Sequence, residues 1–295
     1  MRPEIVKFSA DADRLFPAGG ELRKLSGGYR FSEGPVWDSR QNRLYFTDFF
    51  NDRIYQWTER EGASLYREKS NWAVGLSMDS LGRIVAAEGT SRSVAYTDHE
   101  KSVMVAGKYQ GKILCGPNDV VVSMGGDFFF TDQYPKDIGG PRELAYNGVY
   151  RTTPGGEISL LNNEIGRPNG IAFSPDESIL YVNDTDTQEI FSFHMKSGGT
   201  VSEKKVFAVL DRSYGDGAPD GMKVDIEGNV YVTGPGGIWI IGSAGVPLAV
   251  LKCPEYAGNL CFGGGDSKTL FVTASTSLYA LSMGIPGIVP YRKEE

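Results

Sequence analysis

A six-fold repeat constrains the fold of this 295-residue chain more than any other feature of its sequence. Each copy is a short phrase followed by a turn signal and an apolar run typical of a β-strand. The copies are EGPVWD, VGLSMD, NDVVVS, NGIAFS, DGMKVD and NLCFGG, and they begin at residues 33, 74, 118, 169, 220 and 259. Four-stranded repeats of roughly 40–50 residues are typical of propeller blades, which bury their apolar faces only by stacking on neighbouring blades.

The composition of the runs between the copies favours strands throughout. Runs such as RLYFTD, ILYVND and NVYVTG are rich in Val, Tyr, Phe and Thr and are bounded by Gly, Asp or Asn. Capped helical periodicity is absent, so we expect almost no helix. We therefore predict an all-β chain that forms one domain over residues 1–295, a six-bladed β-propeller with four antiparallel strands per blade. Residues 1–32 should supply the strand that closes the last blade, because propeller edges must be short or paired.

Charge and composition exclude several classes of protein. The net charge of −7 argues against nucleic acid and against anionic membrane surfaces as partners, because both would require a clustered basic face. No stretch approaches the roughly 20 apolar residues of a membrane span, and the N-terminus does not resemble a signal peptide. Cys115, Cys253 and Cys261 are odd in number and lack CxxC spacing, so we expect free thiols. These features predict a cytoplasmic protein.

The first residue of the repeated phrase is acidic or an amide in five of the six copies, and only Val74 departs from this pattern. If the copies are equivalent, five oxygen-bearing side chains point at one central axis, namely Glu33, Asn118, Asn169, Asp220 and Asn259. Carboxylate and amide oxygens suit hard divalent cations. Such residues also make turns between blades, but their recurrence favours a site. We expect the glycine that follows Glu33, Asn169 and Asp220 to let the backbone turn tightly there.

Catalytic motifs based on histidine can be tested by elimination. The chain has two histidines, His99 and His194, and neither lies in a repeated phrase. This argues against a Ser-His-Asp triad and against a histidine-rich zinc site. GxSxG, HExxH and phosphate-binding loops are also absent from the sequence. Any catalysis would therefore come from a metal ion together with a carboxylate.

The third blade carries an insertion at Gln133–Gly148, between two apolar runs. Its Gly, Pro and charged residues exclude a strand, and loops of this kind on a rigid scaffold often carry function. We expect a lid or rim over the tunnel mouth, with Tyr134 and Tyr146 as candidate substrate contacts. The alternative is a surface insertion without a function.

Several ordered motifs resemble those of a known family. SEGPVW, GPNDVVV, RPNGIAFSPDESILYVNDT, PDGMKVDIEGNVYV and NLCFGGGDSKTLFVTA are similar to segments of the senescence-marker-protein/gluconolactonase/luciferin-regenerating-enzyme family, to which regucalcin belongs. The resemblance implies a six-bladed propeller with one divalent metal ion in its central tunnel. It implies that Glu33, Asn169 and Asp220 are the metal ligands and that Asn118 contacts the substrate and, in some members, the metal.

Two positions depart from the family pattern. Many gluconolactonase-like members carry an EHG segment followed by Arg, whereas this chain has no histidine in the stretch from Ala87 to Arg92. Glu88 and Arg92 are still candidates for substrate contacts at the tunnel mouth, with a salt bridge at the strand end as the alternative. Gly116 stands where some animal members have a sugar-binding arginine. These departures argue against an aldonolactone but not against lactones in general.

The resemblance and the residues together predict a divalent-metal-dependent lactonase whose partner is a small-molecule lactone. Calcium is the first choice of cofactor, with zinc, manganese, magnesium and iron as alternatives. Asp220 is the candidate general base, and the alternatives are a hydroxide bound to the metal ion and the carboxylate of Glu88. Two other functions remain open, a metal-dependent hydrolase of organophosphates or other esters and a non-catalytic calcium- or ligand-binding propeller.

Overall fold

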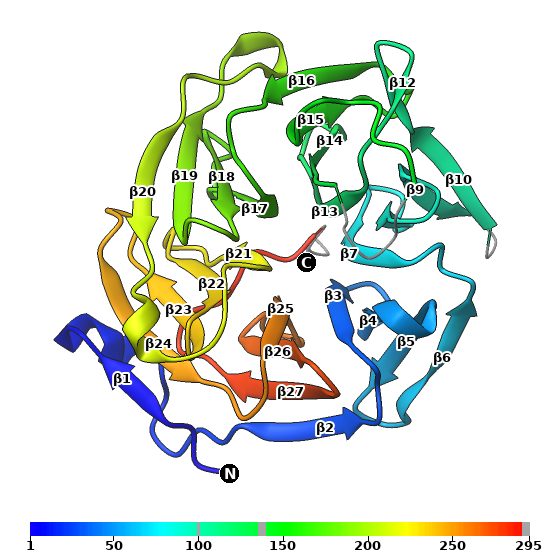
Figure 1. Cartoon of the computed structure of the whole chain (residues 1–295). Coiled ribbons are helices and arrows are strands. Elements are labelled where there is room, and N and C mark those ends of the chain that lie inside the picture. The colour runs from blue at the N-terminus through cyan, green and yellow to red at the C-terminus, as the bar shows by residue number, and fades with distance from the viewer. Residues whose placement is uncertain (99–100, 135–139, 291–295) are drawn as a thin grey trace.

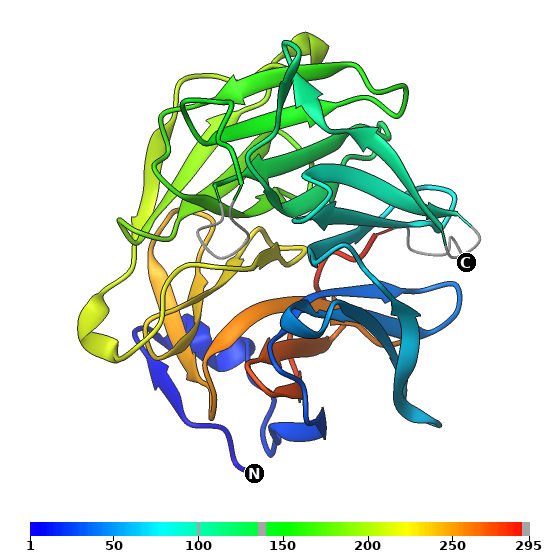
Figure 2. The same ribbon diagram turned by 45° about the vertical axis from the view of Figure 1, so that its right-hand side comes forward.

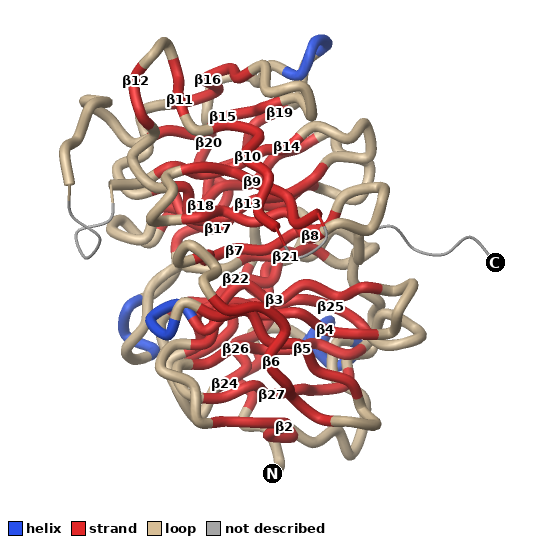
Figure 3. Tube along the Cα trace, turned by 90° about the vertical axis from the view of Figure 1, so that its right-hand side faces the viewer, coloured by secondary structure: helices blue, strands red, loops and turns tan. Residues whose placement is uncertain are grey.

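Six antiparallel sheets stand around a central axis in the computed structural model, which describes residues 1–98, 101–134 and 140–290 (Figure 1). Each sheet runs from an innermost strand beside the axis to an outermost strand at the rim. The predicted all-β six-bladed propeller is thereby confirmed. Figure 3 shows that strands make up most of the ring and that helices are short.

The first three blades follow one another in chain order. Blade one contains β3 (Ser32–Asp38), β4 (Arg43–Asp48), β5 (Arg53–Thr58) and β6 (Gly62–Glu68). Blade two contains β7 (Ala73–Met78), β8 (Ile84–Glu88), β9 (Ser93–Asp98) and β10 (Lys101–Ala106). A two-stranded hairpin, β11 (Lys108–Tyr109) and β12 (Lys112–Ile113), leads to blade three. Blade three contains β13 (Pro117–Val122), β14 (Phe128–Asp132), β15 (Gly148–Thr152) and β16 (Ile158–Asn162).

The last three blades complete the ring. Blade four contains β17 (Pro168–Phe173), β18 (Ile179–Asp184), β19 (Glu189–His194) and β20 (Lys205–Val209). Blade five contains β21 (Met222–Val224), β22 (Val230–Gly234), β23 (Gly237–Ile241) and β24 (Pro247–Lys252). Blade six contains β25 (Ala257–Gly263), β26 (Thr269–Ala274) and β27 (Ser277–Ser282). The described residues form four 3₁₀ helices, η1 (Ala10–Arg14), η2 (Phe49–Asn51), η3 (Ser197–Gly199) and η4 (Arg212–Tyr214).

The N-terminal residues close the ring. β2 (Arg23–Gly27) pairs with β27 in antiparallel register, which places Arg23 opposite Ala280 and confirms the predicted closure of the last blade. β1 (Ile5–Lys7) pairs with β24 as a fifth strand of blade five, which the sequence did not suggest. The N-terminal segment, blue in Figures 1 and 2, therefore supplies the outermost strand of two neighbouring blades.

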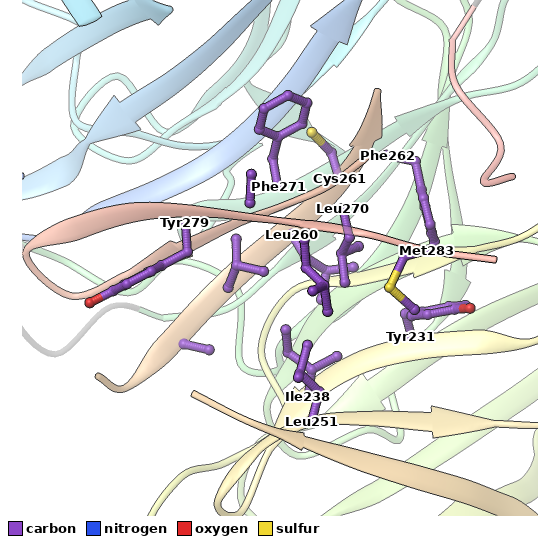
Figure 4. Close-up of a cluster of buried hydrophobic side chains, with 14 of the residues drawn as sticks. Tyr231, Ile238, Leu251, Leu260, Cys261, Phe262, Leu270, Phe271, Tyr279 and Met283 are labelled. Atoms are coloured by element: carbon purple, nitrogen blue, oxygen red, sulfur yellow. The ribbon is translucent and has the colours of Figure 1, made fainter. Parts of the chain in front are cut away.

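Large side chains fill the space between blades. In blades five and six, Tyr231 meets Phe262 edge to face with ring centroids 4.9 Å apart, and Figure 4 shows both rings within a cluster of buried side chains. Trp37 of blade one stacks on Phe271 of blade six at 5.3 Å. The three cysteines are free, as expected. No helix among the described residues is long and apolar enough to cross a membrane.

The innermost strands carry an irregularity at the repeated phrase. The register of β3 against β4 shifts between Glu33 and Val36, and that of β17 against β18 shifts between Pro168 and Ile171. β13 shifts in the same place. An irregularity of this kind bends the strand and redirects a side chain. It therefore explains how a side chain at the start of an inner strand turns toward the axis.

The segment after β27 crosses the centre of the ring, where it is red in Figure 1. Gly287 bridges to Asp225, and the Ile288 N–H donates to the carbonyl of Val224 at 3.0 Å. Ile288 and Pro290 also line an apolar cavity of about 140 Å³ among the inner strands. The larger cavity of about 440 Å³, described next, shares no lining residue with it.

Candidate metal-binding and active site

A cavity of about 440 Å³ opens where the inner strands begin. It has a polar part, an aromatic part and one basic side chain. It is lined by Phe31, Glu33, Phe49, Phe50, Val74, Gly89, Gly116, Pro117, Asn118, Gln133, Arg167, Asn169, Asp220 and Tyr256.

Four of the five predicted oxygen-bearing side chains meet in this cavity, namely Glu33, Asn118, Asn169 and Asp220. Asn259 does not line it. The Asn259 Oδ1 accepts the N–H of Leu260 at 2.8 Å, and its side chain hydrogen-bonds Glu33. Asn259 therefore contacts Glu33 and does not face the cavity. Val74, the apolar exception, also lines the cavity.

The glycines of the repeated phrase serve mainly for close approach between inner strands. A β-carbon on Gly221 would overlap the Asn259 side chain and lie 2.6 Å from its Cα. A β-carbon on Gly170 would overlap the carbonyl oxygen of Asp220. Only Gly34 has the left-handed backbone that a tight turn requires, with φ at +45°. The expectation of a tight turn is therefore wrong for Gly170 and Gly221.

The side-chain oxygens of Asn118 and Asn169 are available as ligands. Oδ1 of Asn118 and Oδ1 of Asn169 are buried and have no hydrogen-bond partner in the described part of the chain. The Asn169 amide is oriented by its Nδ2, which donates to Thr185 Oγ1 at 3.2 Å, and Thr185 in turn donates to the Pro219 carbonyl at 2.9 Å. A buried acceptor without a partner costs free energy, and a bound cation would remove that cost.

The pKa values of the two carboxylates, Glu33 and Asp220, are both raised. Burial raises the pKa of Glu33 well above its usual range, and the nearby charge of Asp220 raises it further. Burial also raises the pKa of Asp220 to about 7, with a contribution from Asp119 that Asn169 and Arg167 partly offset. The described residues contain no cluster of three His, Cys, Asp or Glu side chains able to hold a metal ion. Two carboxylates and amide oxygens nevertheless fit a hard divalent cation.

Asp119 is a buried carboxylate near Glu33 and Asp220 that the sequence analysis missed. Its Oδ1 accepts the N–H of Val120 at 2.8 Å, and its Oδ2 is buried without a partner among the described residues. Burial raises its pKa, and the ammonium group of Lys223 lowers it. The available signal was the repeat itself, because Asp119 follows Asn118 where four other copies have glycine.

Glu88 lies in a buried network and not in the cavity. Its carboxylate is 3.3 Å from the Arg67 guanidinium and accepts hydrogen bonds from Asn71, Ser91 and Ser102. Glu88 ends β8 as Asp132 ends β14, and Asp132 accepts the backbone N–H groups of Cys115 and Gly116. The acidic residue that ends the second strand, Glu88 in blade two and Asp132 in blade three, therefore has a structural role in both blades.

The other predicted substrate contacts support the insertion and do not line the cavity. Arg92 Nη1 donates to the carbonyl of Pro141 at 2.6 Å. The Tyr134 hydroxyl donates to the carbonyl of Gly140 at 2.7 Å, and the backbone carbonyl of Tyr146 accepts the Cys115 thiol at 3.4 Å. Residues 135–139 of the predicted lid lie outside the described residues, so its role as a lid stays a prediction.

Sequence reasoning also missed Arg167, which lines a wall of the cavity, whereas Gln133 belongs to the insertion predicted to form its rim. Arg167 and Gln133 line one side, and the Arg167 Nε donates to Gln133 Oε1 at 2.9 Å. Arg167 stands two residues before Asn169, as Gly116 stands two residues before Asn118. The equivalent position in blade three, Gly116, was considered because some family members have an arginine there. Applying the repeat to that position would have identified Arg167 in blade four.

Comparison with known proteins agrees with this architecture. Residues 31–276 match a family model described as SMP-30/Gluconolactonase/LRE-like region. A gluconolactonase of Zymomonas mobilis is 31% identical over 92% of this chain and 84% of its own length. A pentonolactonase of Haloferax volcanii is 26% identical over 86% of this chain and 84% of its own length. The solved structure of a gluconolactonase from Xanthomonas campestris, 29% identical, superposes with a TM-score of 0.87 over 96% of this chain and 95% of its own.

Proposed function

Because the chain belongs to the SMP-30/gluconolactonase/LRE-like family, we propose that it is a divalent-metal-dependent lactonase that opens a lactone ring to a hydroxy acid. The observation that carries this proposal is the convergence of the buried Glu33 carboxylate, the half-buried Asp220 carboxylate and two partnerless amide oxygens on one cavity. Calcium is the first choice of ion, since all the ligands are oxygens. Zinc, manganese, magnesium and iron are the alternatives.

Glu33, Asn169 and Asp220 would hold the ion, and Asn118 would orient the ester beside it. When bound, the ion would polarise the lactone carbonyl as a Lewis acid. Water adds to the carbonyl carbon, the bond from that carbon to the ring oxygen breaks, and the ring oxygen leaves with a proton as a hydroxyl group. The products are a carboxylate and an alcohol on the same molecule, and the second proton of the water is released to the solvent.

Asp220 is the proposed general base. Of the two cavity carboxylates, Glu33 is the more firmly held, because its Oε2 accepts the Gly34 N–H at 3.0 Å and its side chain also bonds to Asn259. Asp220 has Asn169 as its side-chain partner. His194 is exposed at the end of β19, and His99 lies outside the described residues. Glu88 is held in its own network.

A hydrolysis assay by pH-stat, on a panel of lactones with and without chelator, tests the proposal. We expect turnover that chelation abolishes and that added calcium or another divalent ion restores. Organophosphate esters in the same panel test the alternative hydrolase. Metal-loaded protein that hydrolyses no lactone, or turnover that survives complete removal of the metal, would overturn it.

Two variants test the assigned roles. Glu33→Gln should lower the metal content measured by elemental analysis, because it removes one of two ligand charges. Asp220→Asn should lower turnover per bound metal by about 10²-fold or more, which is the usual contribution of a general base. Turnover per metal near the wild-type value in Asp220→Asn would remove Asp220 from this role.

A further inference from the structure

The mouth of the cavity has two chemically different sides. Phe31, Phe49, Phe50 and Tyr256 form an aromatic side. Their rings touch one another, with centroids 4.9 Å apart for Phe49 and Phe50 and 6.2 Å apart for Phe31 and Tyr256. Aromatic faces of this kind pack against the C–H face of a small ring. They would therefore orient one face of a bound lactone.

Arg167 lines the cavity from the start of blade four, whereas Phe31, Phe49 and Phe50 lie beside the strands of blade one. It is the only Lys or Arg among the described residues that line the cavity. One guanidinium nitrogen, Nη1, lies 3.5 Å from the carboxylate of Asp186 in an exposed pair. Such a pair contributes little and leaves the guanidinium able to bind another anion.

The position of Arg167 is maintained from two directions. Gln133 accepts the Arg167 Nε–H on its side-chain oxygen. The residue before it, Gly166, accepts a hydrogen bond at 2.6 Å from Asn147 of the blade-three insertion. Asn147 is itself held by Arg142 and by the N–H of Tyr134. A guanidinium supported in this way loses less side-chain entropy when it binds a ligand.

We propose that Arg167 makes this site selective for lactones that carry an anionic substituent, either a carboxylate or a phosphate. This inference rests on the proposed lactonase function. The lactone carbonyl would lie over Glu33 and Asp220, the ring would pack on the aromatic side, and the anionic group would extend toward Arg167. The planar guanidinium matches both anions in a two-point hydrogen bond.

Paired substrates measure the effect directly. D-Glucaro-1,4-lactone and D-glucono-1,4-lactone share a ring and differ in a carboxylate against a hydroxymethyl group. 6-Phosphoglucono-1,5-lactone and glucono-1,5-lactone form the equivalent phosphate pair. For at least one pair, we expect kcat/KM to be about 10-fold or more higher for the anionic lactone than for the neutral one. A hydrogen bond to a charged group typically contributes a difference of this size. The pair that gives the larger ratio identifies the anion.

Three variants connect that ratio to Arg167. Arg167→Met should lower the anionic-over-neutral ratio of kcat/KM by about 10- to 100-fold. Arg167→Lys should lower this ratio less, because the positive charge is kept. Asp186→Asn should raise it, because the competing carboxylate is removed. Arg212→Met is the matched control. Arg212 is also an exposed arginine that bonds to Asp186, at the backbone carbonyl, but it does not line the cavity, so the ratio should match wild type.

A binding measurement separates this inference from the lactonase proposal. Calorimetry on the metal-loaded protein with D-glucarate and D-gluconate requires no turnover, and wild type should bind glucarate more tightly while Arg167→Met should not. Equal ratios for wild type, Arg167→Met and Arg212→Met would overturn the inference and leave the lactonase intact. If no lactone is hydrolysed, the lactonase proposal fails, and glucarate binding that depends on Arg167 still decides the role of this arginine.

Discussion

Asn169 donates its Nδ2 to Thr185 Oγ1 at 3.2 Å, and this contact turns the amide oxygen into the cavity. Thr185 cannot rotate freely, because its own hydroxyl hydrogen is directed at the carbonyl of Pro219 at 2.9 Å. A residue that does not line the cavity thus determines which end of the amide a cation would meet.

Thr185→Val should therefore weaken the binding of a divalent ion although it leaves every predicted ligand in place. Loss of a residue that orients a ligand typically costs about 10- to 100-fold in metal affinity. Calcium titration by calorimetry measures the change, and Thr185→Ser, which keeps the hydroxyl, is the control. Equal affinities for wild type and Thr185→Val would show that the hydroxyl does not orient the amide.

Gly221→Ala should destabilise the ring. The added β-carbon would overlap the Asn259 side chain and lie 2.6 Å from the Asn259 Cα, so backbone must move. We expect a loss of about 2–3 kcal/mol in the free energy of unfolding, the cost of an overpacked interior. Gly265→Ala is the control, because a β-carbon there meets nothing within 4 Å. A Gly221→Ala protein as stable as this control would mean that the inner strands can separate at no cost.

Glu88→Gln should affect stability and not catalysis. Arg67 and Glu88 are 7% and 1% exposed, so the variant leaves a buried guanidinium without its counter-charge, at a cost of about 3 kcal/mol. Urea unfolding measures this loss, and turnover per bound metal should match wild type. Glu68→Gln, which removes an exposed partner of Arg53, should change stability little. If Glu88→Gln is as stable as wild type but has lost its turnover, then Glu88 and not Asp220 is the base.

Glu255 should make the stability of the protein sensitive to acid. Burial acts to raise its pKa, but hydrogen bonds from Ser277, Thr276 and Tyr279 outweigh burial and lower it to about 2. Since the folded-state pKa is depressed below the usual value of 4.5, this stabilisation is present above pH 4.5 and is lost as the pH falls toward about 2. Thermal unfolding of wild type and Glu255→Gln should differ at pH 6 and converge near pH 2. A constant difference across this range would contradict the assignment.

The sequence predicted the fold well because propeller repeats are local and periodic. Each copy of the phrase marks an inner strand, so counting copies gave the six blades, and the unassigned residues 1–32 indicated the closing strand. The pairing of β1 with blade five was not predictable in this way, because IVK is too short to differ from a loop. Such short strands form where an edge needs a partner, which the sequence does not display.

The site was predicted only in part, for a related reason. Glu33 and Asp220 were found because they begin copies of the repeat, and both line the same cavity. Arg167 precedes its copy, and Asp119 follows the first residue of its copy, so a rule based on that first residue missed both. Glu88 was selected from an incomplete family motif, although its place at the end of a second strand, shared with Asp132, indicated a structural role.

The closing seam joins residues near the two ends of the chain, with Arg23 opposite Ala280. During synthesis, β2 leaves the ribosome before the strands β3 to β26, and its partner β27 emerges only after them. The hydrogen-bonding edge of β2 must therefore wait through the translation of five blades and two strands of the sixth before it is covered. Contacts so distant in sequence slow folding, and an uncovered edge can pair with another chain. The same seam that completes the finished ring is thus the point at which a nascent molecule is most exposed to misassembly.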